Sequence, residues 1–160
     1  MASVYLSLGS NIDDRSLYLN KAISAIRSDI GQVIRGSGLY ETEAWGYKSP
    51  KLFLNMALLV DTSLDPEQLL GTIKHIEKSM GRKNSSTGYS DREIDIDIIF
   101  YSDLQIESDT LTIPHPRMHK RRFVLEPLNE IAPDFVHPVL EKSVREMLAS
   151  LSSLAGGEGG

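Results

Sequence analysis

The run from Arg92 to Tyr101, Arg-Glu-Ile-Asp-Ile-Asp-Ile-Ile-Phe-Tyr, places two carboxylates, Asp95 and Asp97, in a strand-like segment. Alternate side chains of a strand share a face, roughly 6.6 Å apart at a rise of about 3.3 Å per residue. The isoleucines occupy the other face and indicate a core. Unpaired buried charge is costly, and hard cations with oxygen ligands compensate it. The run therefore predicts either a solvated acidic face or a two-cation site for phosphoryl chemistry.

Cations gather near this carboxylate pair in the sequence. The segment His115–Arg122 holds four of the 17 Lys and Arg residues of a chain whose net charge is −5, and Arg82 and Arg92 bracket a polar segment. Any single cation of this kind is typical of a surface, whereas a group beside two carboxylates suits a phosphate chain. The sequence contains neither a P-loop nor a kinase-type glycine loop, so a nucleotide needs a different cradle.

Phe53 and Asn55 alternate in a second strand-like run. An ordinary interpretation is a core aromatic and a turn-facing amide. Asn is disfavoured within strands, however, and its amide offers a donor and an acceptor to the edge of a heterocycle, with Phe53 as a stacking surface. The three histidines other than His115, namely His75, His119 and His137, show no metal-ligand spacing and are interpreted as structural or surface residues.

The elements that position these residues follow from hydrophobic periodicity and from turn chemistry. Their order, β-α-β-β-α-β, predicts an α+β protein with a ferredoxin-like core and an antiparallel sheet. An all-parallel sheet is disfavoured because no helix separates the second and third strands. The last strand is expected inside the sheet. The expected elements are a strand at 4–8 with a turn at 9–11, a helix from Asp13 or Asp14 to Gly31, extended runs at 32–41 and 52–60, a helix from Asp65 to Gly81 with a Gln68 capping box, and a strand at 93–101.

The C-terminal third predicts short strands and helices appended to this core. They comprise a short strand at 111–113, a helix at 123–131 in which Pro127 takes a first-turn position or makes a kink, and a final helix over 140–151. We expect a single domain over residues 1–154 and a disordered tail at 155–160, where the sequence is of low complexity.

Composition limits the class of protein. The chain has 160 residues, 41% apolar and 24% charged, which is ordinary for one globular domain. It contains no cysteine, which excludes a disulfide scaffold and a thiolate metal site, and no run suited to a membrane span or a signal peptide. We expect a cytoplasmic protein, monomeric or weakly homo-oligomeric, that binds a small anionic ligand and neither nucleic acid nor membrane.

Taken together, residues 3 to about 138 resemble the 6-hydroxymethyl-7,8-dihydropterin pyrophosphokinase (HPPK) family of folate biosynthesis. The most specific feature is the Asp-x-Asp strand followed about 20 residues later by Pro-His. The matching segments are Gly9-Ser10-Asn11, Phe53-Leu54-Asn55, Ile76-Glu77, Gly81-Arg82, Arg92–Ile98, Pro114-His115, Arg121, Phe123, Pro127-Leu128 and Ile131-Ala132-Pro133.

The resemblance implies that the chain transfers a pyrophosphoryl group from ATP to the hydroxymethyl oxygen of the pterin and releases AMP. It implies two Mg²⁺ ions on Asp95 and Asp97, and a catalytic set of these two residues with Arg82 and Arg92. It also implies an ATP site formed by Leu70, Lys74, Glu77, Arg82, Arg92, Ile98, Thr112, His115 and Arg121, and a pterin site formed by Thr42, Ala44, Trp45, Phe53, Asn55, Asp95 and Phe123.

Two features depart from the family pattern. Phe53 stands where many members have tyrosine, and the 82–92 loop has Asn84 and Gly88 where arginines are common. Lys83 or the basic segment is a candidate replacement for those arginines, and no side chain is an obvious general base.

The residues alone leave other functions open. A two-metal phosphodiester hydrolase or an Asp-x-Asp glycosyltransferase would use the same carboxylate pair. A ferredoxin-like RNA-binding module is disfavoured, because it needs exposed aromatics and a basic face where this chain has acids.

Overall fold

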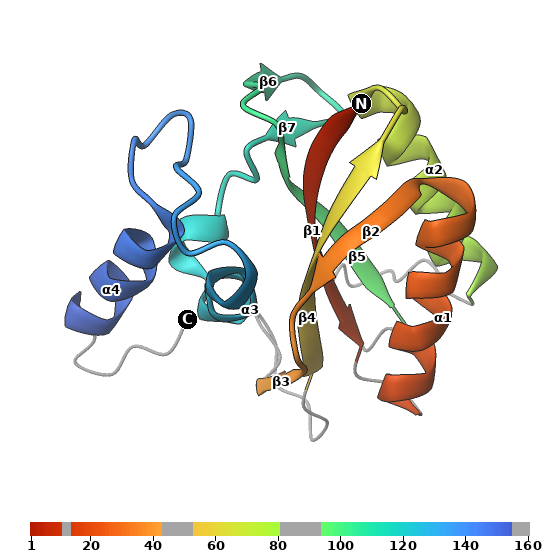
Figure 1. Ribbon diagram of the computed structural model, residues 1–160, viewed down its shortest axis with the longest axis horizontal. Coiled ribbons are helices and arrows are strands. Elements are labelled where there is room, and N and C mark those ends of the chain that lie inside the picture. The colour runs from red at the N-terminus through yellow and green to blue at the C-terminus, as the bar shows by residue number, and fades with distance from the viewer. Residues whose placement is uncertain (11–13, 43–52, 81–93, 155–160) are drawn as a thin grey trace.

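The computed structural model describes residues 1–10, 14–42, 53–80 and 94–154. Within these ranges, a five-stranded antiparallel sheet lies between two layers of helices (Figure 1). This arrangement confirms the predicted α+β class with an antiparallel sheet. The helices are α1 (Arg15–Asp29) and α2 (Pro66–Ser79) on the first face of the sheet, and α3 (Arg122–Ile131) and α4 (Val144–Leu154) on the second.

The strands of the sheet run in the order β2-β4-β1-β5, and β3 pairs with β4 beyond the end of β2. The first strand continues to Ser10, so the turn predicted at Gly9 does not interrupt it. The bounds are β1 (Ala2–Ser10), β2 (Gly31–Gly36), β3 (Tyr40–Thr42), β4 (Phe53–Thr62) and β5 (Asp95–Tyr101), with β6 (Ile106–Glu107) and β7 (Thr112–Ile113) forming a separate hairpin.

Strand β5 lies at an edge of the sheet, so the prediction of an interior position was wrong. Because β4 lies between β1 and β2, one edge of β1 is left for the last strand, which then ends the sheet. The outer edge of β5 is covered by other groups. The Ile96 N–H donates to a Glu77 carboxylate oxygen (2.8 Å), and the Ile99 carbonyl accepts from His115 N (3.0 Å). Such cover protects an edge from pairing with other chains.

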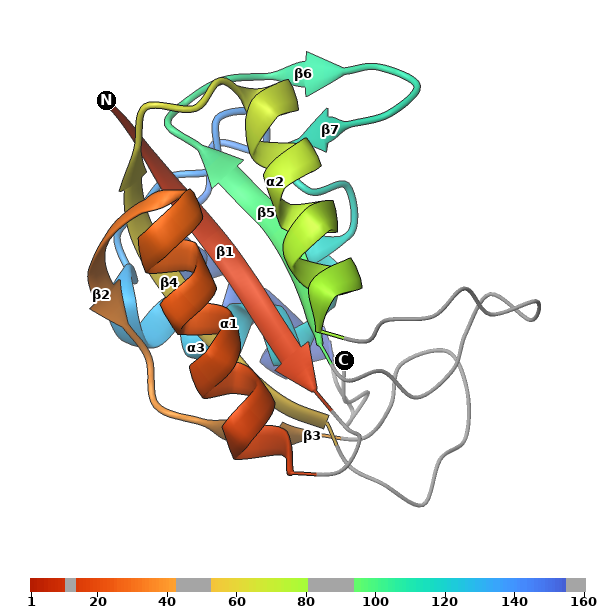
Figure 2. The same cartoon turned by 90° about the vertical axis from the view of Figure 1, so that its right-hand side faces the viewer.

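Helices α1 and α2 lie side by side over the first face of the sheet (Figure 2). Their starts follow local capping rules: Asp14 accepts from Leu17 N (3.0 Å), and Asp65 forms the predicted capping box with Gln68. Their apolar faces pack on one side of β1, β4 and β5. This core contains Val4, Leu6, Leu8, Leu19, Ala22, Ile26, Met56, Leu58, Val60, Leu69, Ile73, Ile76, Ile94, Ile96 and Ile98.

The second face of the sheet packs against α3, α4 and the 3₁₀ helix η1 (Met118–Lys120). An aromatic cluster lies at its centre, where the Phe135 ring centroid is 4.5 Å from that of Phe100 and 5.0 Å from that of Tyr5. Pro127 lies in the interior of α3, so of its two predicted roles the first-turn position is excluded. Leu140 precedes α4, so its predicted place in the final helix was wrong.

His137 is a structural residue, as predicted. It is buried beside Phe100, and its Nδ1 accepts from Val139 N (3.1 Å) and Leu140 N (3.0 Å). Among the described helices, none combines the length and apolar composition that a bilayer span requires. The tail at 155–160 lies outside the described residues, and the single domain over 1–154 stays a prediction.

Candidate active site

Beyond the aromatic cluster, the second face of the sheet carries polar side chains instead of apolar ones. In the strand register, Gly9 of β1 lies between Asn55 of β4 and Asp95 of β5, and Ser7 lies opposite Asp97. Residues paired across antiparallel strands project to the same face. The sheet therefore brings Asn55, Asp95 and Asp97 together, and the two aspartates are half-buried.

Gly9 is required where β1 passes between these residues. A Cβ added to it would lie 2.9 Å from Asn55 Oδ1 and 3.5 Å from the ring of Phe53. The first distance is shorter than ordinary contacts allow, so any larger residue would displace the amide. Asn55 is 3% exposed, and its Nδ2 donates to the Tyr40 carbonyl (3.4 Å). Phe53 and Asn55 thus sit against the backbone of β1, beside the carboxylate pair.

A cavity of about 270 Å³ lies along the outer edge of β5. Five predicted site residues, Leu70, Asp97, Ile98, Thr112 and His115, line it together. Asp97 therefore belongs both to the carboxylate pair and to the cavity wall. The remaining lining residues were not predicted from the sequence. The available signal was that most of them lie within a few positions of Thr112 or His115 in the chain. They are Ile96, Ser108, Asp109, Thr110, Leu111 and Pro116.

Glu77 and Lys74 lie on the same helix as Leu70 but in different surroundings. Glu77 is 5% exposed and accepts the Ile96 N–H, so its carboxylate fastens α2 to β5. Lys74 lies on the exposed surface of α2. Glu77 therefore holds Ile96, a residue of the cavity wall, through its backbone N–H. Sequence spacing alone did not indicate this contact.

His115 connects the cavity to the basic segment. Burial is the main cause that lowers its pKa to about 4; the positive charges of Arg121 and Arg117 lower it further, against the opposing effect of Asp95. Its Nδ1 accepts from Arg117 N (3.2 Å), so the neutral ring carries its proton on Nε2. His115 is therefore an uncharged hydrogen-bond donor at neutral pH.

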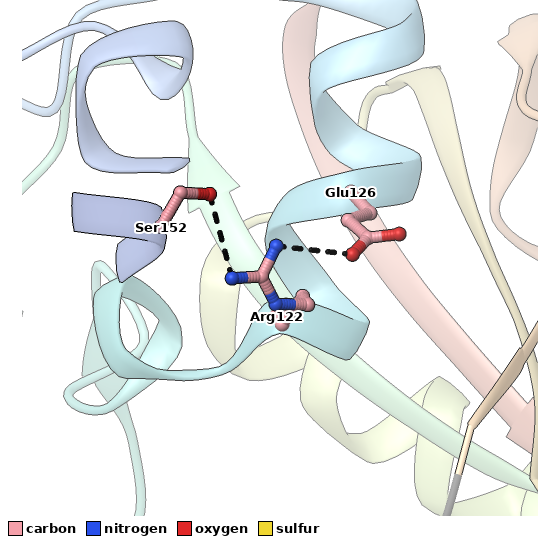
Figure 3. A network of polar contacts seen from close by, with 3 residues as sticks. All are labelled: Arg122, Glu126 and Ser152. Carbon is pink, nitrogen blue, oxygen red and sulfur yellow. Dashed lines mark hydrogen bonds and ion pairs between the residues drawn. The ribbon is translucent and has the colours of Figure 1, made fainter. Parts of the chain in front are cut away.

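The start of α3 separates two roles among the cations. The Arg121 guanidinium carbon lies 5.6 Å from the ring centroid of Phe123, and its positive charge lowers the pKa of His115. The neighbouring Arg122 instead donates to Glu126 Oε1 and to Ser152 Oγ, both at 3.4 Å (Figure 3). Arg122 thus fastens α3 to α4, whereas Arg121 acts electrostatically on His115 of the cavity wall.

Comparison with known proteins shows the family of this chain. The family model described as 7,8-dihydro-6-hydroxymethylpterin-pyrophosphokinase (HPPK) matches residues 5–133. This chain belongs to the HPPK family. It is 44% identical over 146 residues to the 2-amino-4-hydroxy-6-hydroxymethyldihydropteridine pyrophosphokinase of Aquifex aeolicus, over 91% of this chain and 90% of that protein. It is 41% identical over 128 residues to the protein of the same name from Bacillus subtilis, over 79% and 76%.

The fold is also similar to solved structures of larger HPPK proteins. A crystal structure of an HPPK-DHPS in complex with substrates superposes with a TM-score of 0.81 at 17% sequence identity, covering 97% of this chain and 44% of that one. A Plasmodium falciparum HPPK-DHPS gives a TM-score of 0.80 at 18% identity, over 98% and 47%. This chain spans less than half of each of these neighbours, and the similarity concerns the HPPK fold.

Several residues that the HPPK resemblance implicates lie outside the described residues. They are Arg82, Arg92, Ala44 and Trp45, together with Lys83, Asn84 and Gly88 of the loop. Thr42 ends β3, where its backbone pairs with Phe53. Their assignments to the HPPK site remain predictions.

The carboxylate pair offers part of a magnesium site. Within the described ranges, no group of three or more His, Cys, Asp or Glu side chains is arranged to hold a metal ion. Mg²⁺ is commonly held by one or two protein carboxylates, with phosphate oxygens and water completing the shell. Asp95 and Asp97 fit this donor set, and the β1 residues paired with them are Gly9, which has no side chain, and Ser7, which has a small one.

Proposed function

We propose that this chain transfers the pyrophosphoryl group of ATP to the hydroxymethyl oxygen of 6-hydroxymethyl-7,8-dihydropterin and releases AMP, a step of folate biosynthesis. Membership of the HPPK family names the reaction. The structural observation that carries the proposal is the position of Asp97, which lines the cavity beside β5 and shares its strand face with Asp95, next to Asn55. A reaction that transfers a pyrophosphoryl group from a nucleotide to a heterocycle needs two such adjoining sites.

ATP occupies the cavity along β5 in this proposal. Leu70 and Ile98 supply apolar walls for the base, and the Thr112 side chain offers a polar group beside them. Lys74 and Glu77 belong to the nucleotide site through α2. His115 donates from Nε2 to the phosphate chain, with the charges of Arg121, Arg82 and Arg92 around it. The cavity and the neutral state of His115 support this arrangement.

The pterin lies over the Asn55 end of the sheet. The Asn55 amide donates to and accepts from the heterocycle edge, and Phe53 and Phe123 stack on its two faces. Thr42, at the end of β3, completes the site together with Ala44 and Trp45, and Asp95 reaches the hydroxymethyl group. The packing of Phe53 and Asn55 against Gly9, beside the carboxylates, supports this placement.

Asp95 and Asp97 hold two Mg²⁺ ions in the complete complex. When bound, these ions neutralise phosphate charge and polarise the transferred group. The chain itself contributes positioning and charge: the carboxylates fix the place of the triphosphate, and His115 and the arginines stabilise negative charge on the departing AMP. The described cavity is lined by residues of β5, α2 and the β6–β7 hairpin.

Other assignments complete the proposal. We place the core in the ferredoxin-like arrangement, which the antiparallel pairing of neighbouring strands and the order β1-α1-β2-β4-α2-β5 support once the short β3, which lies off the main strand path, is set aside. The cytoplasmic location, the monomeric or weakly oligomeric state and the lack of nucleic-acid and membrane partners stay predictions.

One incubation tests the reaction. The protein is mixed with ATP, Mg²⁺ and 6-hydroxymethyl-7,8-dihydropterin, and the products are separated by chromatography and identified by mass spectrometry. We expect AMP and the pterin diphosphate in equal amounts, with neither formed when the pterin is omitted. ADP as the nucleotide product, or nucleotide turnover independent of pterin, contradicts the proposal and favours a hydrolase that uses the same carboxylate pair.

A further inference from the structure

Glu130, near the C-terminal end of α3, holds the segment that leads into β3. Its Oε1 accepts from the Tyr40 hydroxyl (2.7 Å) and from Gly38 N (3.1 Å), and its Oε2 lies 3.2 Å from the same Gly38 N. Beside it, Arg35 Nη1 donates to the Ile131 carbonyl (2.7 Å). The end of α3 is therefore docked onto the β2–β3 connection by directed polar contacts as well as by packing.

Tyr40 is held at both of its polar ends. Its hydroxyl donates to Glu130, while its carbonyl accepts from Asn55 Nδ2, and the two residues are paired in register across β3 and β4. The hydrogen bond to the Glu130 carboxylate is the largest cause that raises the pKa of Tyr40 to about 12. The phenol therefore stays protonated and keeps donating to Glu130 throughout the neutral range.

The contact with Tyr40 orients the amide of Asn55. Nδ2 lies toward the Tyr40 carbonyl, and Oδ1 lies toward Gly9, 2.9 Å from where a Cβ of that residue would be. An amide turned by half a rotation would exchange its donor and its acceptor. The Tyr40 carbonyl therefore favours one order of donor and acceptor toward a ligand edge.

We propose that Glu130 is a positioning residue for pterin recognition, because it holds Tyr40 where the Tyr40 carbonyl keeps the Asn55 amide in one orientation. This inference rests on the proposed function, since it takes Asn55 to bind the pterin edge. Glu130 lies 90 residues from Tyr40 in the chain, on an exposed part of α3. It acts at a distance from the ligand, through two intervening residues.

The test compares binding of pterin and of a non-hydrolysable ATP analogue to variants of the full chain. Glu130→Ala should weaken pterin binding about five- to tenfold, the size expected for losing hydrogen bonds to a charged group, and leave the ATP analogue unchanged. Glu130→Gln should restore most of the pterin affinity, because one oxygen accepts from both Tyr40 and Gly38. The matched control is Glu126→Ala, one turn earlier in α3, where the carboxylate contacts Arg122.

Two further variants separate positioning from general stability. Tyr40→Phe removes the hydroxyl alone and should reproduce the selective loss of pterin affinity, which keeps the test decisive if Glu130→Ala folds poorly. In an Asn55→Ala background, Glu130→Ala should cause no additional loss, because the two residues act in one chain of contacts.

The opposing outcomes are distinct. Additive losses in the double variant, equal losses for both ligands, or unaltered pterin binding in Glu130→Ala and Tyr40→Phe overturn the inference. Pterin binding and turnover are measured first in the chain without substitutions. If that chain neither binds nor turns over pterin, the proposed function itself is contradicted.

Discussion

The two ends of the second sheet face are built from the same three strands but have different surroundings. At one end, Tyr5 of β1 and Phe100 of β5 pack against Phe135 beneath α3 and α4. At the other end, the same strands carry Gly9 and Asp95 in a polar row with Asn55. The contrast teaches that helix cover decides the use of the face: the covered aromatic end stabilises the fold, and the polar end is left for ligands.

A single irregularity allows β5 to serve both ends. The register between β1 and β5 shifts between Tyr5 and Leu6, where Ile99 is an extra residue on β5. A bulge of this kind changes which alternate residues reach a given face. Asp95 and Asp97 therefore face the site before the bulge, and Phe100 faces the aromatic cluster after it.

The largest expected effect breaks the polar end alone. Asp97→Ala should reduce turnover by several orders of magnitude while the unfolding midpoint stays near that of the original chain, because the residue serves phosphate and metal rather than the core. Steady-state kinetics with Mg²⁺ and thermal unfolding measure the two quantities. The control is Asp61→Ala, a strand carboxylate at the opposite end of the sheet that accepts from Ser3 Oγ (3.3 Å). Near-normal Mg²⁺-dependent turnover in Asp97→Ala would refute the metal assignment.

The converse change breaks the aromatic end. Phe100→Ala should lower the free energy of unfolding by about 3–5 kcal/mol, as expected when a fully buried aromatic side chain is removed from a core. Turnover per folded molecule should fall far less than in Asp97→Ala. Denaturant titration followed by kinetics under folding conditions checks both statements. Leu17→Ala, at a residue 46% exposed, is the control and should leave stability nearly unchanged. A loss as small as that of the control would count against the role given to the aromatic cluster.

A subtler change sharpens the division within the polar end. Asn55→Ala should weaken pterin binding far more than binding of an ATP analogue, because the amide belongs to the polar row proposed to bind the pterin and does not line the cavity beside β5. Calorimetric titration with each ligand measures the difference, with Asn20→Ala on the exposed surface of α1 as the control. Equal losses for the two ligands would place Asn55 in a shared role instead.

The smallest expected effect is a pH dependence of stability that involves both ends. Burial lowers the pKa of His115, to about 4, and also that of His137, from an ordinary value near 6.5. Between these values the unfolded chain binds more protons than the folded one, so stability should fall as the pH drops from about 6.5 toward 4. Denaturant titrations at several pH values test this. His115→Gln should make the fall shallower, and an unaltered slope would contradict the contribution of His115.

Local rules predicted the elements well, because their causes lie within a few residues. The capping box of Asp65 and Gln68 and the alternation that puts Asp95 and Asp97 on one face depend on near neighbours alone. The extent of β1 through Ser10 was missed, because pairing with β4 and β5 outweighs the turn preference of Gly9. Of the two roles predicted for Pro127, the first-turn position was wrong, because packing of α3 outweighs local propensity and keeps this residue in the helix interior.

The sequence by itself determined the α+β class, the amphipathic helices, the shared face of the two aspartates and the resemblance that names the reaction. Only the tertiary structure decided that β5 ends the sheet, that α2 and the β6–β7 hairpin enclose a cavity against it, and that Glu130 reaches Tyr40. The physical reason is range. Periodicity and capping act over a few residues, whereas an edge, a cavity and a lowered histidine pKa arise when segments distant in the chain exclude water together.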